Sequence, residues 1–148
     1  MKTSYLKPDE YGLLREVGEK WMKEHHGTQF SFEISIDTVI DDLIKSGTGV
    51  IALWHEEKVV GFLALFIAQS FMGSQKIAVE KYWYVEPQYR IGGIQLLKQG
   101  QIWAKENGCS HLIMTASNLA SGMYDKVCNL YQKMGMELFE TSYIQEIK

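Results

Sequence analysis

Two adjacent glycines stand where a predicted strand gives way to a predicted helix. Gly92 and Gly93 follow the β-rich run Ile77 to Val85 and precede an amphipathic helical pattern that begins at Ile94. Glycine allows a backbone to come close to a bound group, and the first amides of a helix, together with its dipole, attract anions. The turn therefore predicts a phosphate or pyrophosphate site. The alternative is a tight turn whose glycines only satisfy the backbone angles.

The spacing of these glycines excludes the two commonest nucleotide-binding loops. The chain contains no G-x-x-x-x-G-K-[ST] sequence, and Gly92-Gly93 does not have G-x-G-x-x-G spacing. The segment from Trp83 to Ile94 instead resembles the coenzyme-A motif of the GNAT acetyltransferases. That motif is a strand ending in V-x-P, followed by [QR]-x-x-G-x-[GA] and an amphipathic helix. Val85-Glu86-Pro87 and the helix ending Trp103 to Glu106 are also similar to that family.

The resemblance implies the residues that surround the pyrophosphate, in either of two registers. Counted from Pro87, Arg90 is the leading residue and Gly93 the first glycine. Counted back from Leu96-Leu97, Gln88 leads, Ile91 takes the first glycine position and Gly93 the second. The turn is thus about two residues shorter than the family's, and Gly93 is kept in both registers. The cofactor-binding residues implied are Val85, Gln88, Arg90, Ile91, Gly92, Gly93 and Ile94, with Asn118, after the fifth strand, as a further contact to coenzyme A.

A second segment of resemblance contains a candidate general acid. Residues 130–136 read L-Y-Q-K-M-G-M and are similar to the L-Y-x-K-x-G-F ending of the family's last helix, with Met136 in place of phenylalanine. In that family the tyrosine, here Tyr131, protonates the departing coenzyme-A thiolate. A phenol of pKa ~10 keeps its proton at neutral pH and can donate it to a developing sulfur anion. Read from the residues alone, Tyr131 is better explained as a half-buried amphipathic residue of a helix, and the resemblance favours the acid role.

Glu80 is the first candidate for the base that an amine nucleophile requires. Strict alternation along its strand places Glu80 on the face of Tyr82 and Tyr84, opposite to Trp83. A carboxylate between aromatic rings would have a raised pKa, which suits a base that works near neutral pH. A solvated glutamate at the edge of a strand is the competing interpretation, and Glu86 is the second choice of base.

The elements that must position these residues follow the order of a mixed sheet covered by helices. The expected strands are 3–6, 50–54, 59–68, 77–85 and 111–116, with one or two final strands within 138–147. The expected helices run from Pro8 to Gly27, from the Ser35 cap to Ser46-Gly47, over 94–106 and over 123–134. The resemblance implies a single GNAT domain over residues 1–148, of α/β (α+β) class, whose mostly antiparallel sheet has helices on both faces.

Composition limits the classes of function. The 148 residues are 46% hydrophobic and 22% charged, as expected for one globular domain with its own core. A net charge of -3 without a basic run argues against nucleic acid as a partner. The longest apolar run, Val59 to Ala68, is too short to cross a membrane. Cys109 and Cys128 have neither zinc nor disulfide spacing, so we expect free, largely buried thiols, no metal, and a cytoplasmic protein.

The resemblance implies an N-acetyltransferase that moves an acetyl group from acetyl-CoA, its co-substrate, to a primary amine of a small molecule or protein. In the family the amine attacks the thioester directly, the pantetheine passes between two splayed strands, here 77–85 and 111–116, and a backbone N–H near Val85 stabilises the oxyanion. The acidic net charge favours a cationic amine, and a homodimer is possible. The alternatives are a non-catalytic coenzyme-A-binding or regulatory module, and an interaction protein in which the glycine turn is purely structural.

Overall fold

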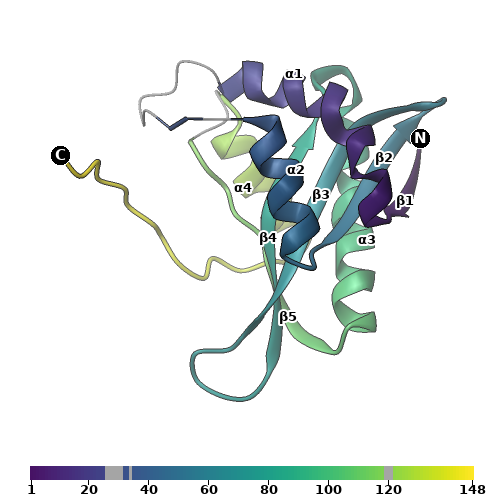
Figure 1. The fold of residues 1–148 in the computed structure, drawn as a ribbon. Coiled ribbons are helices and arrows are strands. Elements are labelled where there is room, and N and C mark those ends of the chain that lie inside the picture. Colours follow the sequence, from purple (N-terminus) through teal and green to yellow (C-terminus); the bar gives the residue numbers. More distant parts are fainter. Residues whose placement is uncertain (26–31, 34, 119–121) are drawn as a thin grey trace.

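The computed structural model describes residues 1–25, 32–33, 35–118 and 122–148 and contains a five-stranded sheet with helices around it (Figure 1). The predicted mixed α/β fold is confirmed. In chain order the elements are β1 (Lys2–Leu6), a 3-10 helix η1 (Pro8–Leu14), α1 (Arg15–His25), α2 (Ile36–Lys45), β2 (Gly49–His55), β3 (Lys58–Gln69), β4 (Lys76–Val85), a second 3-10 helix η2 (Pro87–Gly92), α3 (Gly93–Glu106), β5 (Cys109–Ile113) and α4 (Tyr124–Lys133).

The strands lie in the sheet in the order in which they occur along the chain, from β1 to β5. Neighbours from β1 to β4 are antiparallel, whereas β5 runs parallel to β4. A parallel neighbour requires a crossover connection, and α3 supplies it. Figure 1 shows α1 and α2 on one face of the sheet and α3 on the other.

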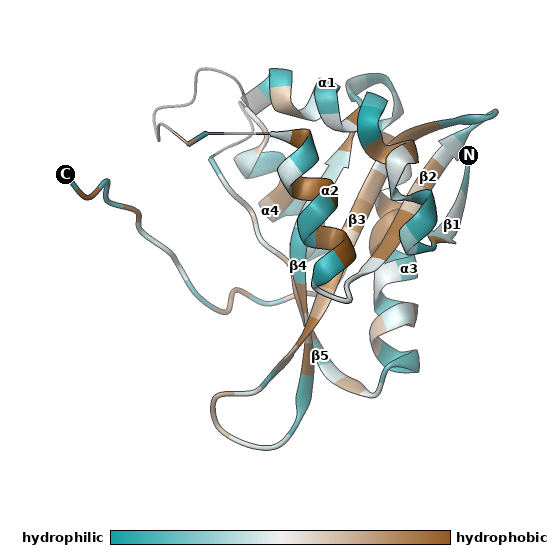
Figure 2. Cartoon of the chain, viewed as in Figure 1, coloured by the Kyte–Doolittle hydropathy of each residue, from teal (hydrophilic) through white to brown (hydrophobic). Residues whose placement is uncertain are grey.

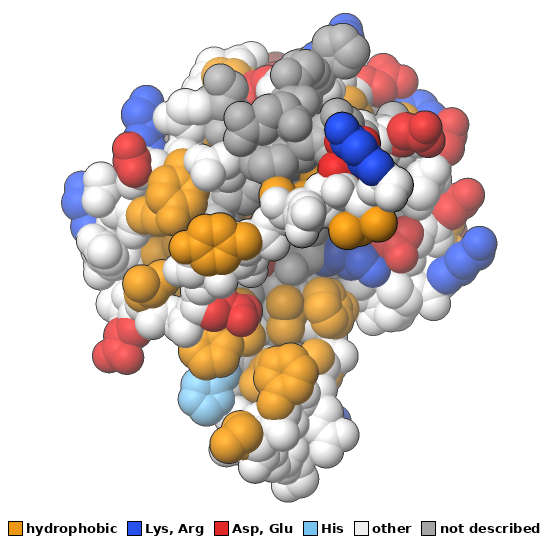
Figure 3. Space-filling model, turned by 90° about the vertical axis from the view of Figure 1, so that its left-hand side faces the viewer, with side chains coloured by type: hydrophobic (Ala, Val, Ile, Leu, Met, Phe, Trp, Pro, Cys, Tyr) orange, Lys and Arg blue, Asp and Glu red, His pale blue; other side chains and the backbone are white. Residues whose placement is uncertain are grey.

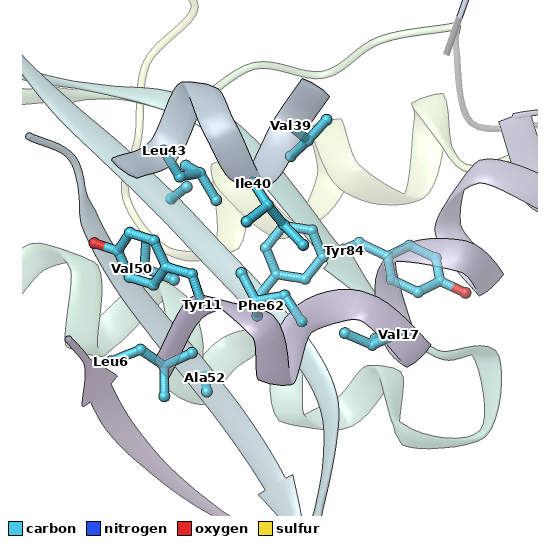
Figure 4. Close-up of a cluster of buried hydrophobic side chains, with 12 residues drawn as sticks. Leu6, Tyr11, Val17, Val39, Ile40, Leu43, Val50, Ala52, Phe62 and Tyr84 are labelled. Carbon is cyan, nitrogen blue, oxygen red and sulfur yellow. The ribbon is translucent and has the colours of Figure 1, made fainter. Parts of the chain in front are cut away.

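Two apolar layers, one on each face, arise because successive side chains of a strand point to opposite faces. The almost uninterrupted apolar runs of β2 and β3, brown in Figure 2, supply both layers. The layer beneath α1 and α2 includes Tyr11, Val17, Ile40, Leu43, Ala52, Phe62 and Tyr84 (Figure 4). The layer beneath α3 includes Ile51, Leu53, Val60, Leu63, Leu65, Val85 and Leu96. Because apolar layers cover both faces of β2 and β3, these two strands form the centre of the sheet, and β4 is held against β3.

The N-terminal helices begin at the signals that the sequence carries. Ser35 caps α2 as predicted, since its hydroxyl accepts a hydrogen bond from the N–H of Thr38 at 3.4 Å. The first predicted helix begins at Pro8 but runs as a 3-10 helix until Leu14 before it becomes α1. Its predicted end, Gly27, lies outside the described residues. Within the described ranges no helix is long and apolar enough to cross a membrane.

The prediction of final strands within residues 138–147 is wrong. After α4 the chain forms no strand and runs away from the sheet in an extended course (Figure 1). The β-favouring side chains that motivated the prediction, among them Phe139, Tyr143 and Ile147, are exposed. Strand propensity describes how well a side chain suits a pleated, half-buried surface. The segment has the side chains of a strand but no neighbouring strand in this structure.

Candidate active site

A β-bulge in β4 decides which face of the sheet Glu80 occupies. Residues directly opposite each other on antiparallel strands point to the same face. Glu80 is opposite Leu65, whereas Tyr82 is opposite Ala64, so Lys81 is the extra residue of the bulge. Leu65 belongs to the layer beneath α3 and Ala64 to the layer beneath α1 and α2. Glu80 therefore points to the α3 face.

The predicted face of Glu80 is consequently wrong. Strict alternation placed it with Tyr82 and Tyr84, but an inserted residue reverses the alternation on one side of the bulge. Glu80 instead lies on the face of Trp83, whose ring packs against the layer beneath α3. Lys81 points the other way and forms an ion pair with Asp42 of α2 at 2.7 Å. The bulge thus sends the base candidate to one side of the sheet and a lysine to the other.

Glu80 bridges β4 to the chain that follows β5. One of its carboxylate oxygens accepts a hydrogen bond from the backbone N–H of Thr115 at 2.8 Å. Burial raises the pKa of Glu80 from 4.5 to about 7, although the hydrogen bond from the Thr115 N–H and the nearby Tyr131 hydroxyl act in the opposite direction. Desolvation therefore exceeds hydrogen bonding here. A carboxyl with this pKa exchanges its proton readily near neutral pH.

Tyr131 reaches the same residue from α4. Its hydroxyl donates a hydrogen bond to the carbonyl oxygen of Thr115 at 2.8 Å, and its ring stacks on Trp83 with centroids 5.9 Å apart. Burial, followed by the charge of Glu80, raises the pKa of Tyr131 well above its usual value. The phenol is therefore firmly protonated. The two predicted catalytic side chains, Glu80 of β4 and Tyr131 of α4, therefore bind the N–H and the carbonyl of the same residue, Thr115.

The two parallel strands separate beside this pair. The β4–β5 ladder covers only Lys76 to Val79 on β4 and ends at Ile113 on β5. Beyond Val79, β4 continues to Val85 along β3. Backbone groups of this last part of β4 that face β5 are outside the β4–β5 ladder, so the sheet opens where Glu80 and Tyr131 lie.

The glycine turn differs from the predicted one. β4 is followed by the 3-10 helix η2, so the helical path begins at Pro87, and the N–H of Gly93 already donates to the carbonyl of Arg90. Both glycines have ordinary helical angles, with φ of -69° at Gly92 and -58° at Gly93, so neither is required by backbone conformation. Both positions instead leave little room for a side chain. A Cβ on Gly92 would lie 2.5 Å from a methyl of Leu53, and one on Gly93 would lie 3.3 Å from the ring of Trp83.

Arg90, predicted to face a pyrophosphate, holds three parts of the protein together. Its guanidinium forms an ion pair with Glu24 of α1 at 2.7 Å and donates to the carbonyl of Val85 at 3.3 Å. A third contact is to the sulfur of Met123, at the start of α4. Glu24 also accepts a hydrogen bond from the hydroxyl of Tyr84 at 2.9 Å. Arg90 would have to leave Glu24 in order to bind an anion.

The other predicted residues lie at the end of β4 and in the segments that follow β4 and β5. Val85 is the buried last residue of β4, and Ile94, partly buried, lies in the first turn of α3. Three more are exposed: Gln88, Ile91 and Asn118. Glu86, the second choice of base, is 4% exposed and paired with Lys20 at 2.8 Å, while Gln88 donates to its other oxygen at 3.2 Å. An acidic group so engaged is a weaker base candidate than Glu80.

A family model described as "Acetyltransferase (GNAT) family" matches residues 13–136. The chain belongs to the acetyltransferase (GNAT) family. As a member of it the protein is an N-acetyltransferase, an enzyme that transfers acetyl groups to amines. No curated protein matches the sequence significantly.

Solved structures support the same fold for this GNAT chain. An aminoglycoside acetyltransferase from an uncultured soil metagenomic sample is 14% identical, with a TM-score of 0.77, and the match covers 99% of this chain and 98% of that one. A ribosomal-protein-alanine N-acetyltransferase from Brucella melitensis is also 14% identical, with a TM-score of 0.76 and coverage of 99% and 100%. An acetyltransferase from Trypanosoma brucei is 19% identical, with a TM-score of 0.68 and coverage of 99% of each chain.

Three residues of this GNAT site were not predicted from the sequence. Thr115 contributes only its backbone, which no side-chain pattern can reveal. Glu24 reaches the turn from α1, a contact between distant parts of the chain. Trp83 was assigned to a strand, but its importance depends on Tyr131 and Gly93 lying beside it. Its indole N–H is buried and is an unpaired donor among the described residues.

The cysteines and the possible metal ligands of the described residues were the remaining features of the sequence analysis. Cys109 and Cys128 are free thiols, half-buried rather than largely buried as predicted. Burial raises the pKa of Cys109, which makes its thiolate less available. Among the described residues, no group of three or more His, Cys, Asp and Glu side chains is placed to hold a metal ion.

Proposed function

We propose that this acetyltransferase takes the acetyl group of acetyl-CoA and transfers it directly to a primary amine, with Glu80 as general base and Tyr131 as general acid. The observation that carries the proposal is the meeting of these two side chains at Thr115, whose N–H binds Glu80 and whose carbonyl binds Tyr131. Their environments give them opposite tasks. Glu80 has a pKa of about 7, and the pKa of Tyr131 is raised far above neutrality.

The residues present fit coenzyme A on two observations. The sheet opens after Val79, beside Glu80 and Tyr131. The buried indole N–H of Trp83 is unpaired within the described chain, as a donor reserved for a ligand would be.

We assign the pyrophosphate to the start of the η2–α3 helical segment, where the helix dipole favours anions. The residues that would hold it are Gln88, Arg90, Gly92 and Gly93, with Val85, Ile91, Ile94 and Asn118 as further neighbours of the coenzyme. Acetyl-CoA supplies an activated acetyl thioester at the opening between β4 and β5.

The proton movements balance once a protonated amine has released its first proton to water. Glu80, as a carboxylate, would accept the second proton from the attacking amine nitrogen, and Tyr131 would give its hydroxyl proton to the departing sulfur. The Glu80 carboxyl and the Tyr131 hydroxyl lie close enough for each to shift the pKa of the other. The proton taken up at Glu80 can therefore pass to the Tyr131 oxygen and restore both residues. No covalent acyl-enzyme is needed, since the amine attacks the thioester itself.

We further propose that the acceptor is a cationic amine. Two carboxylates, Glu24 and Glu86, lie around the end of β4, at hydrogen-bond distance from Tyr84 and Gln88 respectively. Each is held by one basic side chain, Arg90 or Lys20, and by one neutral donor, and a carboxylate with two donors keeps lone pairs for a third. Two of the similar solved structures are named as enzymes of an aminoglycoside and of a ribosomal protein, so small-molecule and protein acceptors both stay open.

The experiment separates binding from catalysis. Acetyl-CoA should raise the melting temperature of the wild-type protein, because a ligand that binds only the folded state stabilises it by mass action. Gly93→Ala should reduce this increase. The matched control is Gly100→Ala on the same helix, where the new Cβ meets Leu63 at 2.8 Å, far from the turn. It should lower the melting temperature of the free protein but keep the increase with acetyl-CoA.

Amine acceptors can then be screened through the release of free coenzyme-A thiol. A wild-type protein that shows neither a thermal shift with saturating acetyl-CoA nor thiol release with any amine would contradict the proposal. The outcome is different if the wild type releases thiol but both variants, Gly93→Ala and Gly100→Ala, lose the thermal shift to the same extent. The activity would then stand, and the turn would not be part of the acetyl-CoA site.

A further inference from the structure

The indole nitrogen of Trp83 is a buried donor without an acceptor. Among the described residues it is the one buried side-chain nitrogen or oxygen that has no hydrogen-bond partner. Buried polar groups of folded proteins are almost always paired, because a donor that loses water without gaining an acceptor lowers the stability. The indole N–H of Trp54, by comparison, donates to the hydroxyl of Ser4 at 2.8 Å. The unpaired donor of Trp83 therefore costs the free protein stability that a ligand with an acceptor could restore.

Two neighbours define how the Trp83 ring lies. Trp83 is opposite Leu63 of β3, so its side chain points to the α3 face of the sheet. Its ring stacks on that of Tyr131, with centroids 5.9 Å apart and planes at 24°. A Cβ on Gly93 would lie 3.3 Å from Cζ2 and 3.9 Å from Cε2, the ring carbon that is bonded to the nitrogen. The edge that carries the N–H thus faces the start of α3, and the ring lies between the proposed general acid and the glycine turn.

The start of α3 offers this donor no free acceptor. The backbone groups left free in the first turn of a helix are N–H groups, which donate as the indole does. The other surroundings are apolar, since Leu112 and Met114 pack against the same layer as Trp83. Figure 3, which looks onto the side of the molecule where α4 lies, shows hydrophobic side chains gathered there. An acceptor for the indole must therefore come from a bound molecule.

We propose that the indole N–H of Trp83 binds a carbonyl oxygen of the pantetheine arm of acetyl-CoA, an assignment that rests on the proposed function. The arm joins the sulfur of the coenzyme to its pyrophosphate. Tyr131 would meet the sulfur and the turn at Gly93 the pyrophosphate, and Trp83 lies between these two residues. The amides of the arm carry carbonyl oxygens, which accept hydrogen bonds, and an indole can only donate. Trp83 is thus the complementary group at this point of the path.

Removal of the N–H should consequently have opposite effects on the free protein and on binding. The free protein loses a buried donor that has no acceptor, which stabilises it. The complex loses a hydrogen bond, which weakens it. A tryptophan that only fills the core would show neither effect. Because the ring also stacks on Tyr131, Trp83 is a positioning residue that joins the place of the arm to the proposed acid.

Replacement of Trp83 by benzothienylalanine isolates the donor, because a sulfur takes the place of the N–H while the fused ring keeps its shape. The melting temperature of the free protein should rise by a few degrees. The matched control is the same replacement at Trp54, whose N–H is already accepted by Ser4. There the melting temperature should not rise. A fall at position 83 would show that the donor is already paired in the free protein and would overturn the proposal.

Calorimetry with two ligands then locates the acceptor. The replacement at Trp83 should raise the Kd of acetyl-CoA by roughly 5–100-fold, the usual effect of a lost hydrogen bond to a buried donor. The Kd of ADP, which contains the pyrophosphate but lacks the arm, should not change. The replacement at Trp54 should leave both values unchanged. Equal losses for the two ligands would place the acceptor on the pyrophosphate, and a loss for neither would exclude the contact, so both results would overturn the assignment.

These results separate this inference from the proposed function. If the wild type binds acetyl-CoA and the replacement at Trp83 leaves its affinity unchanged, the role of Trp83 is overturned and the acetyl transfer stands. If the wild type does not bind acetyl-CoA at all, both are overturned.

Nuclear magnetic resonance observes the hydrogen bond in the wild-type protein itself. Isotope-labelled protein gives one indole N–H signal for each of the four tryptophans, and the benzothienyl protein identifies that of Trp83 by its absence. Saturating acetyl-CoA should move this proton downfield and leave the signal of Trp54 in place. In kinetics, the replacement at Trp83 should raise the KM for acetyl-CoA and change kcat little, because the ring on Tyr131 is kept. An indole proton of Trp83 that does not move at saturation would refute the contact.

Discussion

Replacing Glu80 by glutamine tests the centre of the proposed site, because it removes the ionisable proton and keeps the shape. Wild-type kcat/KM should rise with pH and level off above about 7, where Glu80 becomes a carboxylate able to accept the amine proton. In Glu80→Gln this rise of kcat/KM with pH should disappear. The rate at pH 8 should fall by roughly 10²–10⁴-fold, the usual contribution of a positioned general base.

The same substitution has a predictable effect on folding. A carboxyl whose pKa rises from 4.5 to about 7 on folding holds its proton more tightly in the folded state by about 3 kcal/mol. This contribution is fully present below the unfolded pKa and is lost as the pH rises through 7. The free energy of unfolding of the wild type should thus decrease from pH 4.5 to 8, relative to that of Glu80→Gln. The variant should be the more stable protein at pH 8 by up to about 3 kcal/mol.

Two assays read these effects independently. Release of coenzyme-A thiol gives the pH–rate profile, and urea unfolding at several pH values gives the free energies. Glu57→Gln, in the exposed turn between β2 and β3, is the matched control and should leave both pH dependences unchanged. A Glu80→Gln enzyme with the wild-type rate and profile would refute the base assignment. Parallel stability curves for the two proteins would refute the raised pKa itself, whatever the kinetics show.

Three further predictions concern the acid, the turn and the arginine. Tyr131→Phe should lower kcat by roughly 10²–10⁴-fold where proton transfer limits the rate, while the thermal shift with acetyl-CoA stays nearly unchanged; an unaltered kcat would make Tyr131 a packing residue. Gly92→Ala should destabilise the protein by about 1–3 kcal/mol in urea unfolding, since its Cβ collides with a buried leucine, whereas Gly12→Ala, with open space around it, should cost far less. Glu24→Gln should free Arg90 and lower the Kd of acetyl-CoA in calorimetry; an unchanged Kd would mean that Arg90 is structural.

The order of elements could be predicted because each carries local signals. The Ser35 cap, the Pro8 start and the apolar runs of β2 and β3 are readable from neighbouring residues, and the structure confirms them. The resemblance to the family likewise named Tyr131, and the need for a base on the central strand named Glu80, before their proximity was known. Their roles stay predictions, but the two lie together.

What could not be predicted depends on contacts between distant segments. The bulge at Lys81 follows from the register of β4 against β3, and no pattern within β4 reveals it. The engagement of Arg90 by Glu24 joins α1 to the glycine turn, across many residues of chain. The prediction of C-terminal strands was wrong for a related reason. The strand propensity of a segment does not supply the neighbouring strand with which it must pair. In each case the local sequence was compatible with both outcomes, and tertiary contacts decided between them.

The position of the site follows from two irregularities of β4 that flank Glu80. Pairing with β5 ends at Val79, and the bulge falls at Lys81, so Glu80 lies between them. Without the bulge, its carboxylate would face α2 and could not reach α4. Without the separation, Thr115 would belong to the parallel ladder, and its N–H would be taken by β4. A regular sheet would thus exclude both contacts of Glu80, whose pKa near 7 arises because the two irregularities bury its carboxylate beside Tyr131.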